Sequence, residues 1–220
     1  MESSSTGDST TVAHSSTSAQ VTLKQAMVSG EFFSQSTLHE AVPDFTPKPY
    51  AWGTYAADPN IYFFLCEFVD MDEATLPDPQ KFARGLAKLH RTTISPTGKY
   101  GFPVATLQGT VPQFADWTDT WEEFFSRSFK ALVEHEERSQ GPDPEMHKLL
   151  EATFSKVIPR LLRPLETRGR SIRPCLVHGD TWDGNVATNI DTDNPVIFDS
   201  NCIYAHNERE LLLVPNVRLR

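Results

Sequence analysis

The sequence predicts an α+β fold with a helix and a β-hairpin first, a group of helices next and a second hairpin near the end. Short apolar runs bounded by turn residues predict the strands, which we place at residues 50–55, 61–68, 175–177 and 195–198. Apolar side chains that recur at helical spacing predict the helices. With 220 residues and 39% hydrophobic content, the chain can bury one substantial core or two small lobes.

The first predicted helix covers residues 26–40 and carries Glu31 on one face. Three prolines between positions 43 and 49 end this helix, because proline lacks the N–H group that a helix interior needs. The hairpin that follows pairs residues 50–55 with residues 61–68 around a turn at residues 57–60.

The middle of the chain is predicted to be mainly helical. Pro79 opens a helix over residues 79–90, and a loop rich in Gly and Pro follows at residues 99–116. Apolar and aromatic side chains then predict a helix over residues 121–138. A last helix is expected over residues 144–165, with a kink at Pro159.

The most informative segment follows the run 175–177, where residues 178–185 read His-Gly-Asp-Thr-Trp-Asp-Gly-Asn. Asp180 stands five positions before Asn185, and Asp199 follows Asn185 by fourteen residues. The catalytic loop of protein kinases has the same arrangement: one Asp accepts the proton of the attacking hydroxyl, while the Asn and a second Asp hold Mg²⁺. A polar segment at residues 188–194 joins the two apolar runs, so we expect Asn185 and Asp199 at strand ends near one metal ion. The spacing indicates a kinase of the small-molecule type.

Other interpretations of this segment are weaker. Asp and Asn beside Gly also occur in plain turns, and for Asp183 and Gly184 that interpretation is as good as a functional one. His178 is expected to pack and hydrogen-bond within the loop rather than to take part in chemistry. A metal hydrolase would need further ligands at metal spacing, such as His-Glu-x-x-His, and the sequence has none.

Segments along most of the chain carry a resemblance to a known family. They are residues 30–32 (Gly-Glu-Phe), 42–45 (Val-Pro-Asp-Phe), 47–49 (Pro-Lys-Pro), 51–54 (Ala-Trp-Gly-Thr), 65–68 (Leu-Cys-Glu-Phe), 86–91 (Leu-Ala-Lys-Leu-His-Arg), 176–185, 196–199 and 202–208. Together they resemble the fructosamine/ketosamine-3-kinase family, and look closest to its fungal protein-ribulosamine 3-kinases. The specific part is Trp182 in the loop, because the bare His-Gly-Asp and the Asn also occur in aminoglycoside and choline kinases.

This resemblance implies a fold and an activity. The fold is protein-kinase-like (aminoglycoside-phosphotransferase-like), here with a reduced N-lobe and a mainly helical, shortened C-lobe. The activity is transfer of phosphate from ATP, with Mg²⁺, to the sugar 3-hydroxyl of a ketosamine, either on glycated protein or on a small molecule. The phosphorylated adduct is unstable and falls off, so the reaction repairs glycated protein.

The resemblance also assigns roles to residues. Asp180 is implied as the catalytic base, Asn185 and Asp199 as the metal ligands, and Glu31 as the helix residue that pairs with an ATP-binding Lys. Residues 65–68, with Glu67 and Phe68, are implied as the hinge strand that touches adenine.

The acceptor side is less well marked in the sequence. Trp182 is a candidate substrate residue because of its place in the loop. Tyr204, His206 and Glu208 either line the acceptor pocket or pack the lobe, and the sequence does not decide between the two. Trp117 belongs to an aromatic cluster that is more often core than a platform for sugar stacking.

We divide the chain into three parts. Residues 1–20 form a Ser/Thr-rich tail that is expected to be disordered, because it is too polar to bury a core. Residues 21–68 form a remnant N-lobe with the hinge, and residues 69–220 form the C-lobe with the catalytic loop.

Both ends depart from the family pattern. The family has a Gly-rich segment and a strand Lys upstream of the helix Glu. Lys24 stands only seven residues before Glu31, about half the family spacing, and is expected to be a plain exposed Lys. After Leu211 the family continues with further helices, so the chain looks trimmed at both ends.

Composition limits the setting in which the protein acts. A net charge of −9 argues against nucleic acid or an anionic membrane as the main partner. Three widely spaced cysteines read as reduced thiols rather than as a disulfide framework. No apolar run reaches the length of a membrane span, and the N-terminus lacks the features of a signal peptide or presequence. We expect a cytoplasmic protein and a monomer.

Two alternatives to an active ketosamine kinase stay open. A catalytically dead pseudokinase that binds partners or substrate is favoured by the missing Lys and Gly-rich segment. A choline- or aminoglycoside-type kinase is favoured only by the shared loop. The retained Asp180, Asn185 and Asp199 favour a kinase whose activity is reduced, and the sequence does not separate ribulosamine from fructosamine as its substrate.

Overall fold

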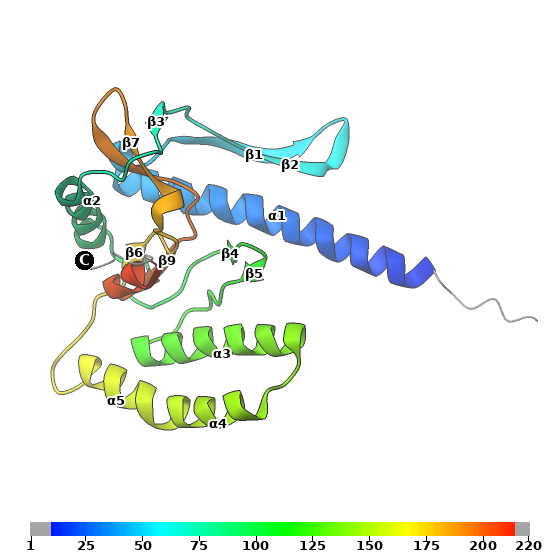
Figure 1. Cartoon of the computed structure of the whole chain (residues 1–220), viewed down its shortest axis with the longest axis vertical. Coiled ribbons are helices and arrows are strands. Elements are labelled where there is room, and N and C mark those ends of the chain that lie inside the picture. The colour runs from blue at the N-terminus through cyan, green and yellow to red at the C-terminus, as the bar shows by residue number, and fades with distance from the viewer. Residues whose placement is uncertain (1–9, 214–220) are drawn as a thin grey trace, which may run out of the picture.

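The structure, a computed structural model, describes residues 10–213 and has the mixture of helices and small sheets of an α+β fold (Figure 1). The helices are α1 (Thr10–Ala41), α2 (Pro79–Thr92), α3 (Trp121–Gln140), α4 (Pro144–Ala152) and α5 (Ile158–Leu162). The strands are β1 (Pro49–Tyr55), β2 (Asp58–Cys66), β3 (Met71–Asp72), β4 (Leu107–Gln108), β5 (Val111–Pro112), β6 (Cys175–Val177), β7 (Val186–Asn189), β8 (Asn194–Ile197) and β9 (Ile203–Ala205). No helix within residues 10–213 combines the length and the apolar character that crossing a bilayer requires.

Helix α1 begins at Thr10, sixteen residues before the predicted start at residue 26, and ends as predicted just ahead of Pro43. The expectation of a disordered tail over residues 1–20 therefore differs from the structure from Thr10 onwards, while residues 1–9 lie outside the described part. Residues 10–25 contain neither Gly nor Pro. Extending a helix that packing has already nucleated costs little, whereas starting one is unfavourable, so this polar segment can continue the helix.

Strands β1 and β2 form an antiparallel hairpin that runs beside α1 (Figure 1). The turn is tighter than predicted, because Pro59 belongs to β2 and Tyr55 already pairs with Asp58. Proline is tolerated in this strand because only one edge of β2 is paired in the hairpin. Strand β2 ends at Cys66, so Glu67 and Phe68 follow the strand rather than form part of it, which corrects the predicted strand end.

Helices α3, α4 and α5 pack together on the side of the molecule away from α1 (Figure 1). The predicted single helix over residues 144–165 is interrupted: a turn of π-helix at Thr153–Val157 separates α4 from α5. Pro159 cannot donate a backbone hydrogen bond, and the helix widens immediately before it, as the predicted kink implies.

Strands of the last third of the chain form two small antiparallel sheets: β7 and β8 join the early strand β3 in one, and β6 pairs with β9 in the other. The apolar runs at 175–177 and 195–198 are strands, as predicted, but they are not partners. Strand β8 pairs with β7, part of which was expected in the polar connection, and β6 pairs with β9. In the β7–β8 pairing Val186 lies opposite Ile197 and Ala187 opposite Val196, and all four residues are buried.

The core surrounds these strands. Every residue of β6 and β9 is buried, and three helices contribute side chains to the core cluster that contains these strands. The contributing helix residues are Leu38 of α1, Leu86 and Leu89 of α2, and Trp121 and Phe124 of α3. The loops that follow β6 and β8 therefore begin at strands that are packed in this core.

Candidate active site

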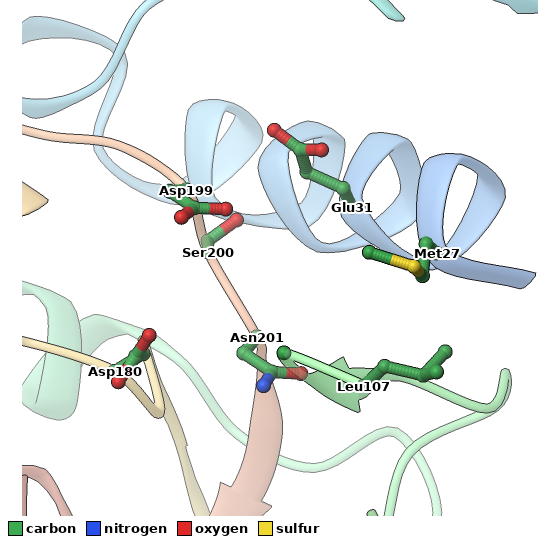
Figure 2. A pocket seen from close by; sticks show the side chains of 8 residues that line it. Met27, Glu31, Leu107, Asp180, Asp199, Ser200 and Asn201 are labelled. Carbon is green, nitrogen blue, oxygen red and sulfur yellow. The ribbon is translucent and has the colours of Figure 1, made fainter. Parts of the chain in front are cut away.

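Three acidic side chains from distant parts of the sequence line one cavity of about 140 Å³. Asp180 comes from the loop after β6, Asp199 from the segment after β8 and Glu31 from α1, and Figure 2 shows them around the same space. The other lining residues are Met27, Leu107, Gly109, Ser200 and Asn201. Within the described part of the chain, no Lys or Arg lines the cavity, so the charges that face it are negative.

The loop that carries Asp180 leaves β6 through a sharp turn at Gly179. Gly179 has a φ of +85°, and a Cβ at this position would collide with the carbonyl oxygen of Asn201. His178 is fully buried; its Nε2 lies 2.9 Å from Phe198 O, and its Nδ1 lies 3.3 Å from the backbone N of Asp180. Burial lowers the pKa of His178, so the ring is neutral, donates from Nε2 and accepts at Nδ1. The prediction that His178 shapes the loop is confirmed.

Asn185 is bound to Asp180, five residues earlier. Its Nδ2 donates to the backbone O of Asp180 (2.9 Å) and to Asp180 Oδ2 (3.1 Å). Both hydrogen bonds use the amide nitrogen, which leaves the amide oxygen for another partner. On the other side, Gln108 of β4 approaches the same carboxylate, with Nε2 3.4 Å from Asp180 Oδ1. The Asp180 carboxylate is thus oriented by two amide side chains, of which the sequence predicted only Asn185.

Asp199 follows β8 by two residues and has a left-handed backbone, with a φ of +55°. This conformation is unfavourable for a residue other than Gly, and such strain is concentrated at functional sites. The segment after it is tied to α1, because Ser200 Oγ donates to Gln35 Oε1 (3.1 Å) and Cys202 N donates to Ser34 Oγ (3.1 Å). Helix α1 therefore holds both Glu31 and the Asp199 segment in place.

Glu31 faces Asp199 without a cation between them in the described part of the chain. Burial raises the pKa of Glu31 to about 7, and the negative charge of Asp199 acts in the same direction. None of the ion pairs among the described residues includes Glu31 or Lys24. Lys24 is exposed, as expected, and stands on helix α1 about two turns before Glu31.

Glu210, which no sequence motif marks, anchors the loop that carries Asp180 from the side opposite the cavity. Its side chain is buried; Oε2 accepts a hydrogen bond from the backbone N of His178 (2.7 Å) and Oε1 accepts one from Thr181 Oγ1 (2.9 Å). His90 Nε2 also lies 3.3 Å from Oε2. Burial alone would raise the pKa of Glu210, but these hydrogen bonds outweigh it and the pKa lies below its usual value. Because Glu210 lies in the charged run Glu-Arg-Glu, it looks like a surface residue in the sequence, and no local signal marks it as buried.

The predicted hinge residues lie outside the cavity. Phe68 is 89% exposed, and Glu67 is exposed with its Oε2 accepting a hydrogen bond from the backbone N of Lys48 (3.1 Å). The end of β2 is nevertheless close to Glu31: burial raises the pKa of the Cys66 thiol, and the charges of Glu31 and Glu67 add to the effect. Any adenine contact of Glu67 or Phe68 would thus form at the outer rim of this region.

The four candidate substrate residues do not line the acidic cavity. Trp182 is 44% exposed and its ring covers Gly184. Tyr204 is buried and stacks on Trp117, with 6.1 Å between ring centroids, so both are packing residues in this structure. His206 and Glu208 line a separate cavity of about 310 Å³. The structure therefore places Tyr204 in the core and the other three at the surface or around the second cavity.

The side-chain oxygens near Asp199 are of the kind that Mg²⁺ binds. Within residues 10–213, no group of three or more His, Cys, Asp or Glu side chains could hold a metal ion by itself. Mg²⁺ rarely uses such a cage; it binds through one or two protein ligands together with substrate phosphates and water. The Asp199 carboxylate and the amide oxygen of Asn185 are ligands of that kind, and the acidic cavity favours a cation. The residues present fit Mg²⁺ that arrives with phosphates.

Solved structures define the class of fold to which the chain belongs. A candidate fructosamine-3-kinase from Thermobifida fusca has a TM-score of 0.66 and 22% identity, covering 86% of this chain and 61% of its own. A second, from Haemophilus somnus, has a TM-score of 0.59 and 18% identity, covering 86% of this chain and 60% of its own. This likeness establishes the kinase-like fold of these structures. The family model for fructosamine kinase matches residues 17–217, and the chain belongs to the fructosamine kinase family.

Individual relatives agree with this assignment, so the resemblance predicted from the motifs is confirmed. A chloroplastic protein-ribulosamine 3-kinase of Oryza sativa subsp. indica is 29% identical over 185 residues, covering 84% of this chain and 51% of the relative. The ketosamine-3-kinase of Mus musculus is 40% identical over 116 residues, covering 52% of this chain and 35% of the relative. The chain thus spans about half the length of the first of these relatives and about a third of the second.

Proposed function

We propose that this chain carries the phosphoryl-transfer site of an ATP-dependent kinase that phosphorylates the sugar 3-hydroxyl of protein-bound ketosamines. The observation that carries the proposal is that Asp180, held by Asn185, and Asp199 converge on one cavity although nineteen residues separate them. Proton acceptance and metal binding are the two tasks that phosphoryl transfer requires of side chains at this spacing. The names of the relatives, protein-ribulosamine 3-kinase and ketosamine-3-kinase, support the substrate class.

In this proposal Asp180 is the base. Its Oδ atoms accept the proton of the sugar hydroxyl as the new O–P bond forms and the bond to the ADP leaving group breaks. Asn185 and Gln108 hold the carboxylate so that an oxygen faces the cavity, and Glu210 fixes the backbone of the loop behind it. Preorganisation of this kind lowers the barrier because no reorientation is needed during the reaction.

The nucleotide side is assigned to the remaining predicted residues. Asn185 and Asp199 would hold Mg²⁺, which would neutralise the charge that develops on the phosphates. Glu31 lies beside Asp199 and would orient a cationic partner of the phosphates. Glu67 and Phe68, after β2, would contact adenine from the outside of the same region.

The negative charge of the cavity agrees with a ketosamine as the acceptor. The amine of a ketosamine is protonated near neutral pH and its sugar is neutral, so such a molecule is attracted to Asp180, Asp199 and Glu31. Phosphorylation at the 3-hydroxyl would initiate deglycation of a glycated lysine, on ribulosamine or fructosamine adducts. We propose a reducing compartment such as the cytoplasm, because Cys66, Cys175 and Cys202 are free thiols.

A pseudokinase that binds ligand without transferring phosphate is the second candidate. The observation that favours it is the uncompensated pair of Glu31 and Asp199, since no cationic side chain of residues 10–213 lines that cavity. The choline- or aminoglycoside-type alternative loses its support, because the family match covers most of the chain.

The test is phosphate transfer from ATP·Mg²⁺ to a lysine peptide that carries a ribulosamine, followed by mass spectrometry of the peptide. We expect transfer by the wild-type chain and a loss of at least about 10²-fold in Asp180→Asn, because the general base is removed. Asp183→Asn is the matched control, since Asp183 is exposed in the same loop and its variant should keep wild-type activity. A folded wild-type chain that binds ATP but transfers no phosphate would support the pseudokinase instead.

A further inference from the structure

Asn201 lines the acidic cavity, and its side-chain oxygen has no hydrogen-bond partner among the described residues. It is 4% exposed, and its Oδ1 is buried without a hydrogen bond from any described residue. The same side chain lines the cavity with Asp180 and Asp199, and Figure 2 shows its amide between Asp180 and Leu107. A buried polar atom without a partner is uncommon in native structures and calls for a physical explanation.

The backbone of Asn201 is firmly held, which leaves the side chain little freedom to turn away. Its N–H donates to His178 O (2.9 Å), and its carbonyl oxygen accepts from Gln113 Nε2 (3.4 Å). Gly179 packs against the same carbonyl so closely that no Cβ would fit there. The peptide units on both sides of Asn201 are therefore used in building the catalytic loop, and the side chain is directed to the cavity.

Burying an amide without a partner is unfavourable, so a ligand that hydrogen-bonds it would bind with a corresponding gain. The chemistry of that ligand is limited by its surroundings. The unpaired atom is an acceptor and needs a donor: a neutral hydroxyl can donate to the amide oxygen and also accept from the amide nitrogen, whereas a phosphate oxygen can only accept. A polyhydroxyl compound with a positive charge elsewhere satisfies both the amide and the carboxylates.

We propose that Asn201 determines acceptor specificity: its amide hydrogen-bonds a second hydroxyl of the ketosamine sugar while Asp180 faces the hydroxyl that is phosphorylated. This inference rests on the proposed function and names the part of the acceptor that the cavity recognises. Because Asp180 and Asn201 line the same cavity from different loops, the sugar is gripped at two points and its reacting hydroxyl is oriented.

The experiment measures binding of a fructosamine-modified lysine to the full chain by calorimetry, with ATP affinity measured in parallel. Asn201→Ala should weaken acceptor binding about tenfold, the effect of one neutral hydrogen bond, and leave ATP binding unchanged. Asn201→Leu keeps the side-chain volume without the polar atoms and should show the same loss. A series of ketosamines that each lack one sugar hydroxyl identifies the hydroxyl that the amide contacts. The compound without that hydroxyl should bind the wild type and Asn201→Ala with equal affinity.

Thr106→Val is the matched control. Thr106 is 1% exposed and its Oγ1 is also buried without a partner among the described residues, but Thr106 does not line the cavity. Both substitutions remove an unpaired buried polar atom, so neither Asn201→Leu nor Thr106→Val should lower the urea midpoint of unfolding. Only the Asn201 variants should weaken acceptor binding.

Three results would overturn the inference. Acceptor binding by Asn201→Ala equal to that of the wild type would show that the amide does not touch the sugar. A lower urea midpoint in both Asn201 variants would identify the side chain as structural. A wild-type chain that binds no ketosamine would overturn the inference together with the proposed substrate class, whereas wild-type binding with unchanged variants would overturn the inference alone.

Discussion

Glu210 is fully buried and Glu31 is partly buried, and the charges and hydrogen-bonding groups around these two carboxylates differ. Glu210 accepts hydrogen bonds from His178 N and Thr181 Oγ1 and lies next to His90, and its pKa is lowered. Glu31 is also shielded from water, but its close charged neighbour is Asp199, and its pKa is raised to about 7. Hydrogen-bond donors rather than depth of burial therefore decide which carboxylate stays ionised.

The two regions around these residues differ in the same way. The Glu210 side is closed by hydrogen bonds: His178 is bound to Phe198 O after β8, Asn185 to Asp180 O within the loop, and β6 to β9. The Glu31 side is open, since the hairpin beside α1 has only two strands and leaves Tyr50, Ile61 and Leu65 more than half exposed. The two sides thus differ in how far the charge of their carboxylates is compensated, and the following experiments test that contrast.

The largest effect is expected from removing the carboxylate between the two regions. Asp199→Asn should lower kcat about 10²–10³-fold, because one preorganised charge at the reacting phosphate is lost. Asp193→Asn is the control: Asp193 has the same left-handed backbone, with a φ of +55°, but is exposed at the β7–β8 turn. If steady-state kinetics showed the same loss of kcat in both variants, the loss would come from the left-handed backbone that the two positions share and not from the charge at position 199.

The next largest effect is expected on the pH dependence of stability, to which Glu31 contributes. Its pKa is about 7 in the folded chain against an ordinary value of 4.5, so between these values the folded chain keeps a proton that the unfolded chain has lost. Stability should therefore fall as pH rises from about 4.5 to 7, by at most about 3.5 kcal/mol at about 1.4 kcal/mol per pKa unit. Urea unfolding from pH 4.5 to 8 should show this slope in the wild type and a flatter one in Glu31→Gln. Equal slopes in the two proteins would contradict the proposed charge imbalance.

The smallest effect is expected on the closed side. Glu210→Gln should reduce the free energy of unfolding by about 1–3 kcal/mol, because a buried acceptor for the loop is weakened. Glu208→Gln, at an exposed position two residues earlier, should change it by no more than about 0.5 kcal/mol. Since the pKa of Glu210 is lowered, its contribution is present above the usual Glu pKa and is lost as pH falls through the folded value. Equal denaturation curves for the two variants at pH 7 would remove Glu210 from its anchoring role.

Local chemistry made much of the fold predictable. The prolines near residue 43 and at position 79 fixed helix ends, and apolar runs located β1, β2, β6 and β8. The start of α1 and the partner of β8 were missed because both depend on tertiary packing: a nucleated helix can extend through polar residues, and strand register follows burial.

The residues of the candidate site also fall into two groups: those that local sequence predicts and those that depend on contacts between distant segments. The five-residue spacing of Asp180 and Asn185 is local, and the structure joins the two by a hydrogen bond. Glu31 was identified only through resemblance, since 149 residues separate it from Asp180. Gln108, Asn201 and Glu210 were missed, because an amide or a carboxylate in a loop gives no sign of which distant group it will meet.

Gly179 limits how this sequence can change over time. Every other residue would place a Cβ against the carbonyl of Asn201 and would need an unfavourable left-handed backbone. A library of random single substitutions should therefore return no functional variant at position 179, although its neighbours Asp180 and Asn201 could each be exchanged without unfolding the chain. Gly179, which has no side chain, is then the residue of this loop that tolerates substitution least. Any change of acceptor specificity would have to arise from substitutions at other positions of the site.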